Sequence, residues 1–309
     1  MTEISRRRGA GALRRNTLWC WAFLAPTLAL YVMFNGWPIV SGLYYATLDW
    51  SGLSSSKEFV GLANFVEVAH DPYFWNSYRN SFTFMLGVVP IHLAIGLLIA
   101  VALNRKDLRF ATGYRTLFFL PVVTTAAIVG IIMIFILAAD GPINQLLLMS
   151  GAIKKPLDFL GNSKLAMGSV IVISGWKNLG TNIVYWLAAL QGIPDELYEA
   201  ATVDGCGGSR LFRHITLPLI LPMGAVIALL NIVGSLKAFD LIKTMTNGGP
   251  FFATDMVATY IYRFAFSSEV GVPRIGYATS AGIFFGVTII IVGALSNTLA
   301  SRIKANSAK

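Results

Sequence analysis

The chain alternates between long apolar runs and shorter polar segments. The apolar runs approach the length of about 20 residues that a helix needs to cross the hydrocarbon core of a bilayer. Their length favours helices over strands. The runs predict membrane spans at about 18–42, 80–103, 116–139, 165–190, 217–236 and 276–301. The pattern therefore predicts an all-α membrane protein built as a bundle of six transmembrane helices.

Composition agrees with a membrane setting. The sequence is 55% hydrophobic and 13% charged, whereas soluble domains carry about 25% charged residues. Five arginines precede the first run, which is longer than the apolar core of a signal peptide and has no Ala-x-Ala cleavage site. We therefore expect a retained first span, with segment 1–17 before it, a membrane domain over 18–302 and a tail at 303–309.

The distribution of charge predicts the orientation. If the N-terminus is inside, the inner segments hold fourteen basic and six acidic residues, and the outer segments hold nine of each. An excess of Lys and Arg marks the cytoplasmic side. Both termini are thus expected in the cytoplasm, together with the loop at about 191–216 between spans four and five. This distribution also accounts for the net charge of +9 without a nucleic-acid partner.

This inner loop has the residues of two short helices. Acidic residues after Pro194 suit the positive end of a helix dipole, and Gly205 can take the left-handed conformation that ends a helix. Ser209 can cap a second short helix, which leads through Leu217-Pro218 into span five. The loop is expected to form a compact knob on which a partner protein could dock.

Four motifs carry a resemblance to a known family. The spacing Glu199-Ala200-Ala201, Asp204-Gly205, Phe212, Ile215 and Leu217-Pro218 closely resembles the EAA loop of ABC-transporter permeases. The chain is most similar to sugar-type permeases of binding-protein-dependent importers, akin to the maltose and glycerol-3-phosphate permeases. Three further motifs resemble theirs: Phe59–Phe65, Asp140–Leu147 and Thr246–Pro250.

The resemblance implies a type I importer fold with cytoplasmic coupling helices, in the inner membrane of a bacterium. It implies a second, homologous permease as heterodimer partner, two ATPase subunits and a solute-binding protein. Cys206 and Gly208 depart from the family pattern, and the chain lacks the large outer domain of some maltose-type members. The residues expected to dock the ATPase are Glu199, Ala200, Ala201, Asp204, Gly205 and Phe212.

Polar residues inside two spans mark a possible solute path. Ser174, Asn178, Thr181 and Tyr185 recur at helical spacing along span four. Polar groups in lipid must face protein or a wet cavity, so such stripes either bind solute or join helices. The resemblance adds that related permeases contact sugar from the matching stretches. The predicted pathway residues are Ser174, Trp176, Lys177, Asn178, Thr181, Asn182, Tyr185, Asn231, Gly234 and Ser235.

Two ionisable residues lie within predicted spans. Lys177 could favour an anionic solute, or it could be a structural lysine that snorkels or is paired. His92 in span two is expected to make a helix–helix hydrogen bond rather than to relay protons.

The sequence lacks the motifs of an enzyme. It contains no G-x-x-x-x-G-K-[ST] loop, and its three histidines lie on separate segments. We expect no cofactor, metal or catalytic site here, with ATP and Mg²⁺ used by the ATPase subunits. The chain is expected to translocate a sugar or sugar derivative. A phosphorylated or sulfonated polyol such as glycerol 3-phosphate remains an alternative, as do a stand-alone secondary carrier, a membrane enzyme and a scaffold.

Overall fold

The molecule is helical, as the sequence predicts. A computed structural model describes residues 19–105, 108–267 and 271–307. Two short antiparallel strands, β1 (Leu48–Asp49) and β2 (Glu58–Phe59), pair at one end of a helical body. The expected segment 1–17 and the last residues of the expected tail lie outside the described residues.

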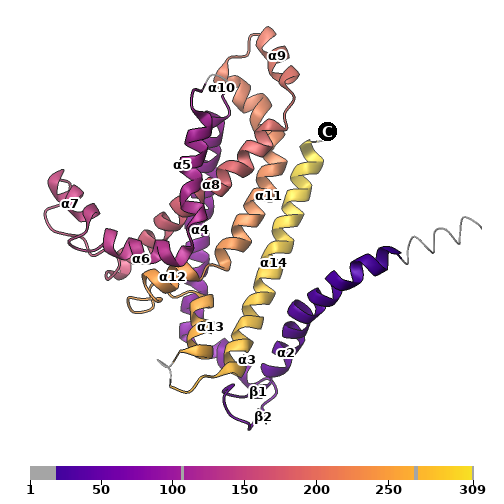
Figure 1. The fold of residues 1–309 in the computed structure, drawn as a ribbon, viewed down its shortest axis with the longest axis vertical. Coiled ribbons are helices and arrows are strands. Elements are labelled where there is room, and N and C mark those ends of the chain that lie inside the picture. The colour runs from indigo at the N-terminus through magenta and orange to yellow at the C-terminus, as the bar shows by residue number, and fades with distance from the viewer. Residues whose placement is uncertain (1–18, 106–107, 268–270, 308–309) are drawn as a thin grey trace, which may run out of the picture.

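An upright bundle forms the body of the molecule (Figure 1). In it α4 packs along α8 and α11, α5 packs on α8, and α14 packs on α11. These helices are α4 (Pro72–Leu103), α5 (Ala111–Val123), α8 (Ser163–Gln191), α11 (Leu217–Leu236) and α14 (Ile275–Ser307).

Short elements collect at the two ends of this bundle. At one end lie α9 (Asp195–Val203) and α10 (Gly208–Leu211), near the C-terminal end of α14. At the opposite end lie the strands, α3 (Ala63–His70) and α13 (Val257–Phe266). The EAA-like loop and the motif that contains Phe59 are therefore at opposite ends of the molecule.

Four helices are long and apolar enough to cross a membrane: Trp19–Tyr45, Pro72–Leu103, Gly208–Leu236 and Ile275–Thr298. The first contains a π-helical turn, η1 (Val32–Gly36), followed by α2 (Trp37–Tyr45), and it leans away from the bundle (Figure 1). Helix α8 has 29 residues, but its polar stripe makes it less apolar than these four. The expected count of six spans stays a prediction.

The predicted third span is not one straight helix. Helix α5 ends at Val123, α6 (Ala126–Ile136) begins three residues later, and their axes differ by 95°. Thr124 and Thr125 are extended, with ψ of 137° and 146°, and the Thr125 side chain accepts a hydrogen bond from the Ile128 N–H. A threonine N-cap therefore starts a new helix in a new direction. Because of this turn, α6 lies across the bundle beside α12 (Asp240–Met245).

The second helix of the inner loop is continuous with span five. Helix α10 passes through a π-helical turn, η2 (Phe212–Thr216), into α11, giving one helix over Gly208–Leu236. Gly207, not Ser209, occupies the N-cap position. Pro218 has no N–H to donate to an ordinary helical hydrogen bond. The π turn just before it shifts the hydrogen-bond register of the helix at this point.

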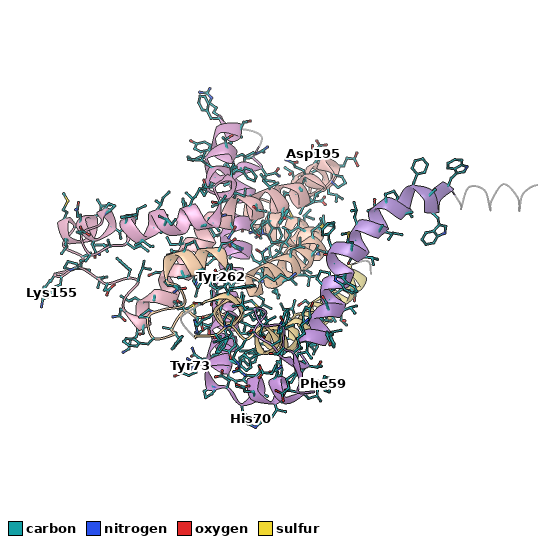
Figure 2. The ribbon with its side chains drawn as sticks, turned by 60° about the horizontal axis from the view of Figure 1, so that its bottom comes forward. Phe59, His70, Tyr73, Lys155, Asp195 and Tyr262 are labelled. Atoms are coloured by element: carbon teal, nitrogen blue, oxygen red, sulfur yellow. The ribbon has the colours of Figure 1, made fainter. Side chains whose placement is uncertain are left out.

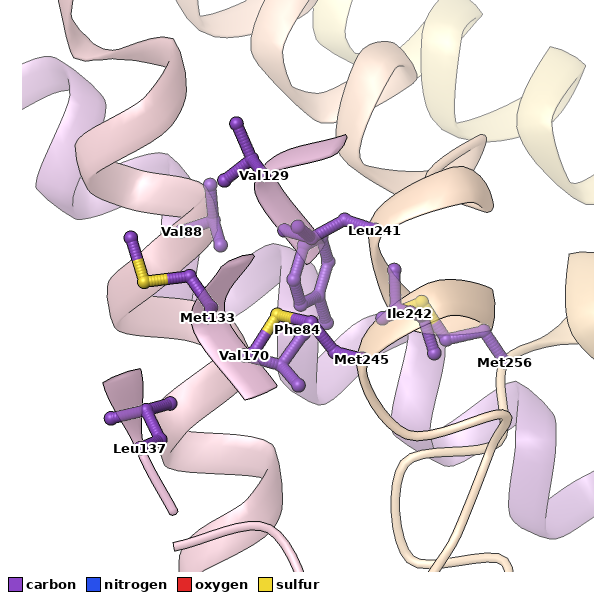
Figure 3. Packing of buried hydrophobic residues seen from close by; sticks show 10 residues of the cluster. All are labelled: Phe84, Val88, Val129, Met133, Leu137, Val170, Leu241, Ile242, Met245 and Met256. Atoms are coloured by element: carbon purple, nitrogen blue, oxygen red, sulfur yellow. The ribbon is translucent and has the colours of Figure 1, made fainter. Parts of the chain in front are cut away.

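Three apolar clusters hold the helices together. In the first, side chains of α4, α6, α8 and α12 converge around Phe84 (Figure 3). The second fills the space between α4, α8 and α11 toward α9, with Trp186 wedged close to Gly96 and Gly224. The third joins α4, α11, α13 and α14 at the end of the bundle that carries the strands (Figure 1). The first two clusters leave a polar gap between them.

Candidate functional site

A pocket of about 250 Å³ occupies this gap, between α4, α8 and α11. Eight of the ten residues predicted for the solute path line it. These eight are Ser174, Asn178, Thr181, Asn182, Tyr185, Asn231, Gly234 and Ser235. The helical spacing of the stripe therefore brings its members to one hollow.

Trp176 and Lys177 are not among the residues that line the pocket. Trp176 is 46% exposed on the surface of α8, and Lys177 is buried elsewhere. Successive helical residues are about 100° apart, so neighbours in sequence need not share the face that carries Asn178. Among the described residues that line the pocket, none is an Asp, Glu, Lys or Arg.

Sequence analysis missed the α4 wall of the pocket. Phe84, Val88 and His92 follow one another at intervals of four and line it, together with Leu230 and Ala238. The spacing is visible in the sequence, but apolar residues that recur once per helical turn look like ordinary core. His92 makes the expected helix–helix hydrogen bond: its Nδ1 lies 2.8 Å from Asn231 Oδ1.

This bond belongs to a chain that crosses three helices. Asn231 Nδ2 donates to Asn182 Oδ1 at 2.6 Å and to the Ile227 carbonyl at 2.8 Å. Asn182 Nδ2 then donates to the Asn178 carbonyl at 3.1 Å. Side chains of α4, α11 and α8 are thus joined by neutral hydrogen bonds along one wall of the pocket.

The EAA-like residues lie on and beside α9. Gly205 has φ of +78°, its N–H donates to the Thr202 carbonyl, and the Cys206 N–H donates to the Ala201 carbonyl. This is a Schellman ending of the helix, as the glycine predicted. Glu199, Ala200, Asp204 and Gly205 are exposed, Phe212 is half-buried and Ala201 is buried.

Part of this knob was not anticipated. Val203 is 87% exposed and Leu197 is 42% exposed, so α9 also presents apolar side chains to its surroundings. A shallow cleft of about 670 Å³ runs between α9 and the end of α4, lined by Glu199, Val203 and Asn104 among others. The knob therefore combines acidic and apolar surface around a concavity.

Buried asparagines of two other family-like motifs, Phe59–Phe65 and Asp140–Leu147, bind backbone carbonyls. Asn64 donates to the carbonyls of Ala46 and Leu48 at 3.0 and 2.9 Å. Asn144 donates to the carbonyls of Ala138 and Leu157, both at 2.9 Å. Both asparagines are buried. These motif residues fix the shape of their loops.

The loop after span five is held by a buried ion pair. Asp255 Oδ1 accepts from Arg263 Nη2 at 2.6 Å and from Thr259 Oγ1 at 2.7 Å, and Oδ2 accepts from Ser77 Oγ at 2.9 Å. Phe251, on the same loop, is 92% exposed.

The EAA-like loop and the motif that contains Phe59 lie far apart. Figure 2 shows Asp195, at the start of α9, on the side opposite Phe59 and His70. The pocket lies between them in the middle of the bundle.

Comparisons with known proteins agree with these features. The family model for "binding-protein-dependent transport system inner membrane component" matches residues 92–305, more than half of the chain. The probable ABC transporter permease protein YurN of Bacillus subtilis is 33% identical over 286 residues, covering 92% of this chain and 95% of YurN.

Two relatives have named solutes. The lactose transport system permease protein LacF of Rhizobium radiobacter is 31% identical, covering 89% of this chain and 91% of LacF. The sn-glycerol-3-phosphate transport system permease protein UgpA of Yersinia pestis is 37% identical, covering 78% of this chain and 81% of UgpA.

Among solved structures, a chain of a bacterial alginate ABC transporter, crystallised with a periplasmic protein that holds an alginate pentasaccharide, has the same fold. The TM-score is 0.81 at 24% identity, over 95% of this chain and 97% of that one.

Proposed function

The chain belongs to the family of binding-protein-dependent transport system inner membrane components, and from this premise we propose that it is a permease subunit of an ATP-driven importer of a sugar or sugar derivative. The observation that carries the proposal is the pocket between α4, α8 and α11. It gathers amides and hydroxyls from two helices in the middle of an apolar bundle. Amides and hydroxyls are the groups that bond sugar hydroxyls, and buried polar groups without partners are costly in a membrane.

The knob at α9 is proposed to receive force from an ATPase subunit. Glu199 and Asp204 are exposed acceptors for basic side chains, and Val203 supplies an apolar contact beside them. Each of two ATPase subunits would hold one such knob, one on this chain and one on a second, homologous permease. ATP and Mg²⁺ are used in those subunits, and this chain hydrolyses nothing.

Helix continuity supports mechanical coupling between knob and pocket. One helix runs over Gly208–Leu236, from the knob to Asn231 and Ser235 at the pocket. From Phe212 to Asn231 it spans about 28 Å at the usual helical rise of about 1.5 Å per residue. A displacement of α10 would therefore be transmitted along one continuous helix to the pocket wall.

The opposite end is proposed to receive the solute-binding protein. Phe59, Leu62 and Phe251 are exposed there by 73%, 68% and 92%, on loops that buried asparagines and the Asp255–Arg263 pair hold in shape. In this arrangement the chain crosses a bacterial inner membrane several times. The α9 end and both termini face the cytoplasm, and the second permease completes the pathway.

Charge reversal at the knob tests this function. Glu199→Lys should reduce co-purification of the ATPase subunits at least tenfold and abolish uptake, while the variant still inserts and the permease pair still forms. Asp140→Lys is the matched control, because it reverses another exposed acid, which lies outside the knob. Wild-type recovery of ATPase with Glu199→Lys would contradict docking at this knob. Full uptake by vesicles that lack ATPase subunits would favour a secondary carrier.

A phosphorylated polyol is the second candidate, because the relative UgpA is named for glycerol 3-phosphate. A phosphate is most often held by Arg, Lys or a helix N-terminus. The described residues lining the pocket include no Arg or Lys, so the pocket favours an uncharged solute. Uptake of glycerol 3-phosphate in preference to lactose would reverse this order.

A further inference from the structure

Helix α9 carries the proposed docking surface, and it touches the rest of the chain through one narrow face. It projects beyond the end of the bundle (Figure 1). Seven of its nine residues are exposed, whereas Tyr198 is half-buried and Ala201 is buried. These two lie three positions apart, which places them on the same side of the helix. A displacement of α9 must therefore reach the bundle through this face or through the connecting loops.

The connection from α9 to α10 is rich in glycine and makes a weak mechanical link. Gly205 and Gly207 lie in it, and Gly208 opens α10. At all three, the position of an added Cβ has no other group within 4 Å. Glycine has more backbone freedom than any other residue, and the open space around these glycines gives them no support. A push on α9 is therefore more easily absorbed in this connection than passed through it to α10.

A contact between side chains bridges the same gap directly. The Tyr198 hydroxyl lies 3.2 Å from Thr216 Oγ1, within hydrogen-bond distance. Thr216 is 5% exposed and is the last residue of the π turn η2, immediately before α11. Tyr198 also lines a cavity of about 210 Å³ together with Leu190, Phe212 and Thr216. It therefore lies between the end of α8 and the start of span five.

Tyr198 is also within reach of a docked partner. It lines the shallow cleft beside Glu199 and Val203, on the surface proposed for the ATPase subunit. Among the described residues of α9, only Tyr198 lines both this cleft and the smaller cavity behind it. Tyr198 thus borders the docking surface on one side and the π turn on the other.

The π turn is a suitable place for force to enter span five. Such turns interrupt the regular hydrogen bonding of a helix and occur frequently at functional sites. From Thr216 the helix continues without a break to Asn231 at the pocket. That distance is about 22 Å at the usual rise of about 1.5 Å per residue. A movement of Thr216 would therefore reach the pocket wall along continuous helix.

We propose that Tyr198 is the positioning residue that passes the displacement of α9 to span five, through the contact of its hydroxyl with Thr216 at the π turn. This inference rests on the proposed function, because it requires an ATPase subunit that moves α9. It separates two tasks within the knob. Exposed residues such as Glu199 hold the partner, and Tyr198, on the inward face, transmits the movement.

Motion of span five driven by ATP tests the inference without knowledge of the solute. Cys20 and Cys206 are first changed to serine. Leu230→Cys, at a residue of α11 that is 53% exposed and lines the pocket, then reports motion through its rate of maleimide labelling. In the complete transporter with its binding protein, ATP should change this rate. Tyr198→Phe should reduce the ATP-dependent change severalfold, while the ATPase subunits still co-purify.

Further variants separate transmission from stability. Thr216→Val should give the same loss as Tyr198→Phe, and the double variant should be no worse than either, because both break one contact. The double variant leaves no hydroxyl without its partner, so its unfolding midpoint should stay near that of the reference protein. Thr216→Ser keeps the hydroxyl and should keep the response. Tyr114→Phe, at an exposed tyrosine of α5, is the matched control.

The outcomes separate this inference from the proposed function. A full ATP response in Tyr198→Phe, or losses that add in the double variant, would overturn the role of Tyr198 while the importer function stands. Loss of the ATPase subunits from Tyr198→Phe would also overturn it, because Tyr198 would then be a docking residue. A reference protein that recovers no ATPase subunits, or that shows no ATP response, would contradict the proposed function itself.

Discussion

Two polar regions lie within the apolar bundle, and they differ in charge and in how completely their hydrogen bonds are satisfied. At the end that carries the strands, Asp255 is fully buried and accepts from Arg263, Thr259 and Ser77. In the middle, the pocket wall is neutral, and among the described residues Asn178 Oδ1 has no partner. Buried polar groups with all their hydrogen bonds made are typical of a structural cluster, whereas an open acceptor beside a hollow is typical of a binding site. The difference is consistent with a structural role for the Asp255 cluster and supports the proposed solute-binding role of the pocket.

Breaking the Asp255 cluster should have the largest effect. Asp255→Ala leaves Arg263 buried without its carboxylate, and removing one partner of a buried pair costs about 3–5 kcal/mol. We expect a large drop in the midpoint of thermal unfolding in detergent and in yield. Asp140→Ala, at an exposed acid, should change neither. A midpoint for Asp255→Ala within a degree of the wild type would show that the pair is not structural.

Asn231→Leu at the pocket should reduce transport more than it reduces stability. The substitution removes the bonds to His92 and Asn182 and leaves buried groups unsatisfied, at a cost of about 1–3 kcal/mol. We expect uptake into proteoliposomes to fall at least tenfold, with a smaller change in the unfolding midpoint than Asp255→Ala gives. Loss of stability with uptake retained would place Asn231 with the structural cluster.

The knob should respond to backbone strain. Gly205 has φ of +78° and nothing within 4 Å of an added Cβ, so Gly205→Val costs about 1–2 kcal/mol through conformation alone. We expect a severalfold loss of ATPase co-purification. Gly207→Val tests the same loop with φ of −90° and equally open space. Equal losses in the two variants would mean that side-chain bulk, not conformation, matters there.

The exposed Arg274–Glu67 ion pair should matter least. Arg274 makes two 2.6 Å bonds to Glu67, which raise the pKa of Arg274, so it stays charged at every working pH. The pair is 39% and 49% exposed. Exposed pairs contribute about 0–1 kcal/mol. Glu67→Gln should therefore lower the unfolding midpoint slightly at low salt and not at all in high salt.

Much of this architecture could be predicted from the order of apolar and polar residues. Hydrophobic length located the helices, helical spacing brought Asn178 and Tyr185 to one pocket, and Gly205 ended α9. These features depend on residues close in sequence, so local periodicity and conformational preference are enough to find them.

The rest depended on contacts between distant segments. The turn at Thr124 and Thr125 interrupts an apolar run without changing its composition, so hydropathy could not detect it. Lys177 lies off the pocket because rotation about the helix, fixed by packing on α4, decides which face is inward. His92 is hydrogen-bonded to Asn231, which lies 139 positions away in the sequence, and no local pattern predicts such a contact.

The side chains packed around Trp186 block one route by which a solute could leave the pocket. Trp186 packs against Gly96 and Gly224, and Ile183 and Ile227 fill the remaining space between the three helices. A molecule in the pocket would therefore meet tightly packed side chains on any path toward α9 through the interior of this chain. Under the proposed function, the solute would therefore leave along the side of the subunit, and this chain would form only one wall of the channel.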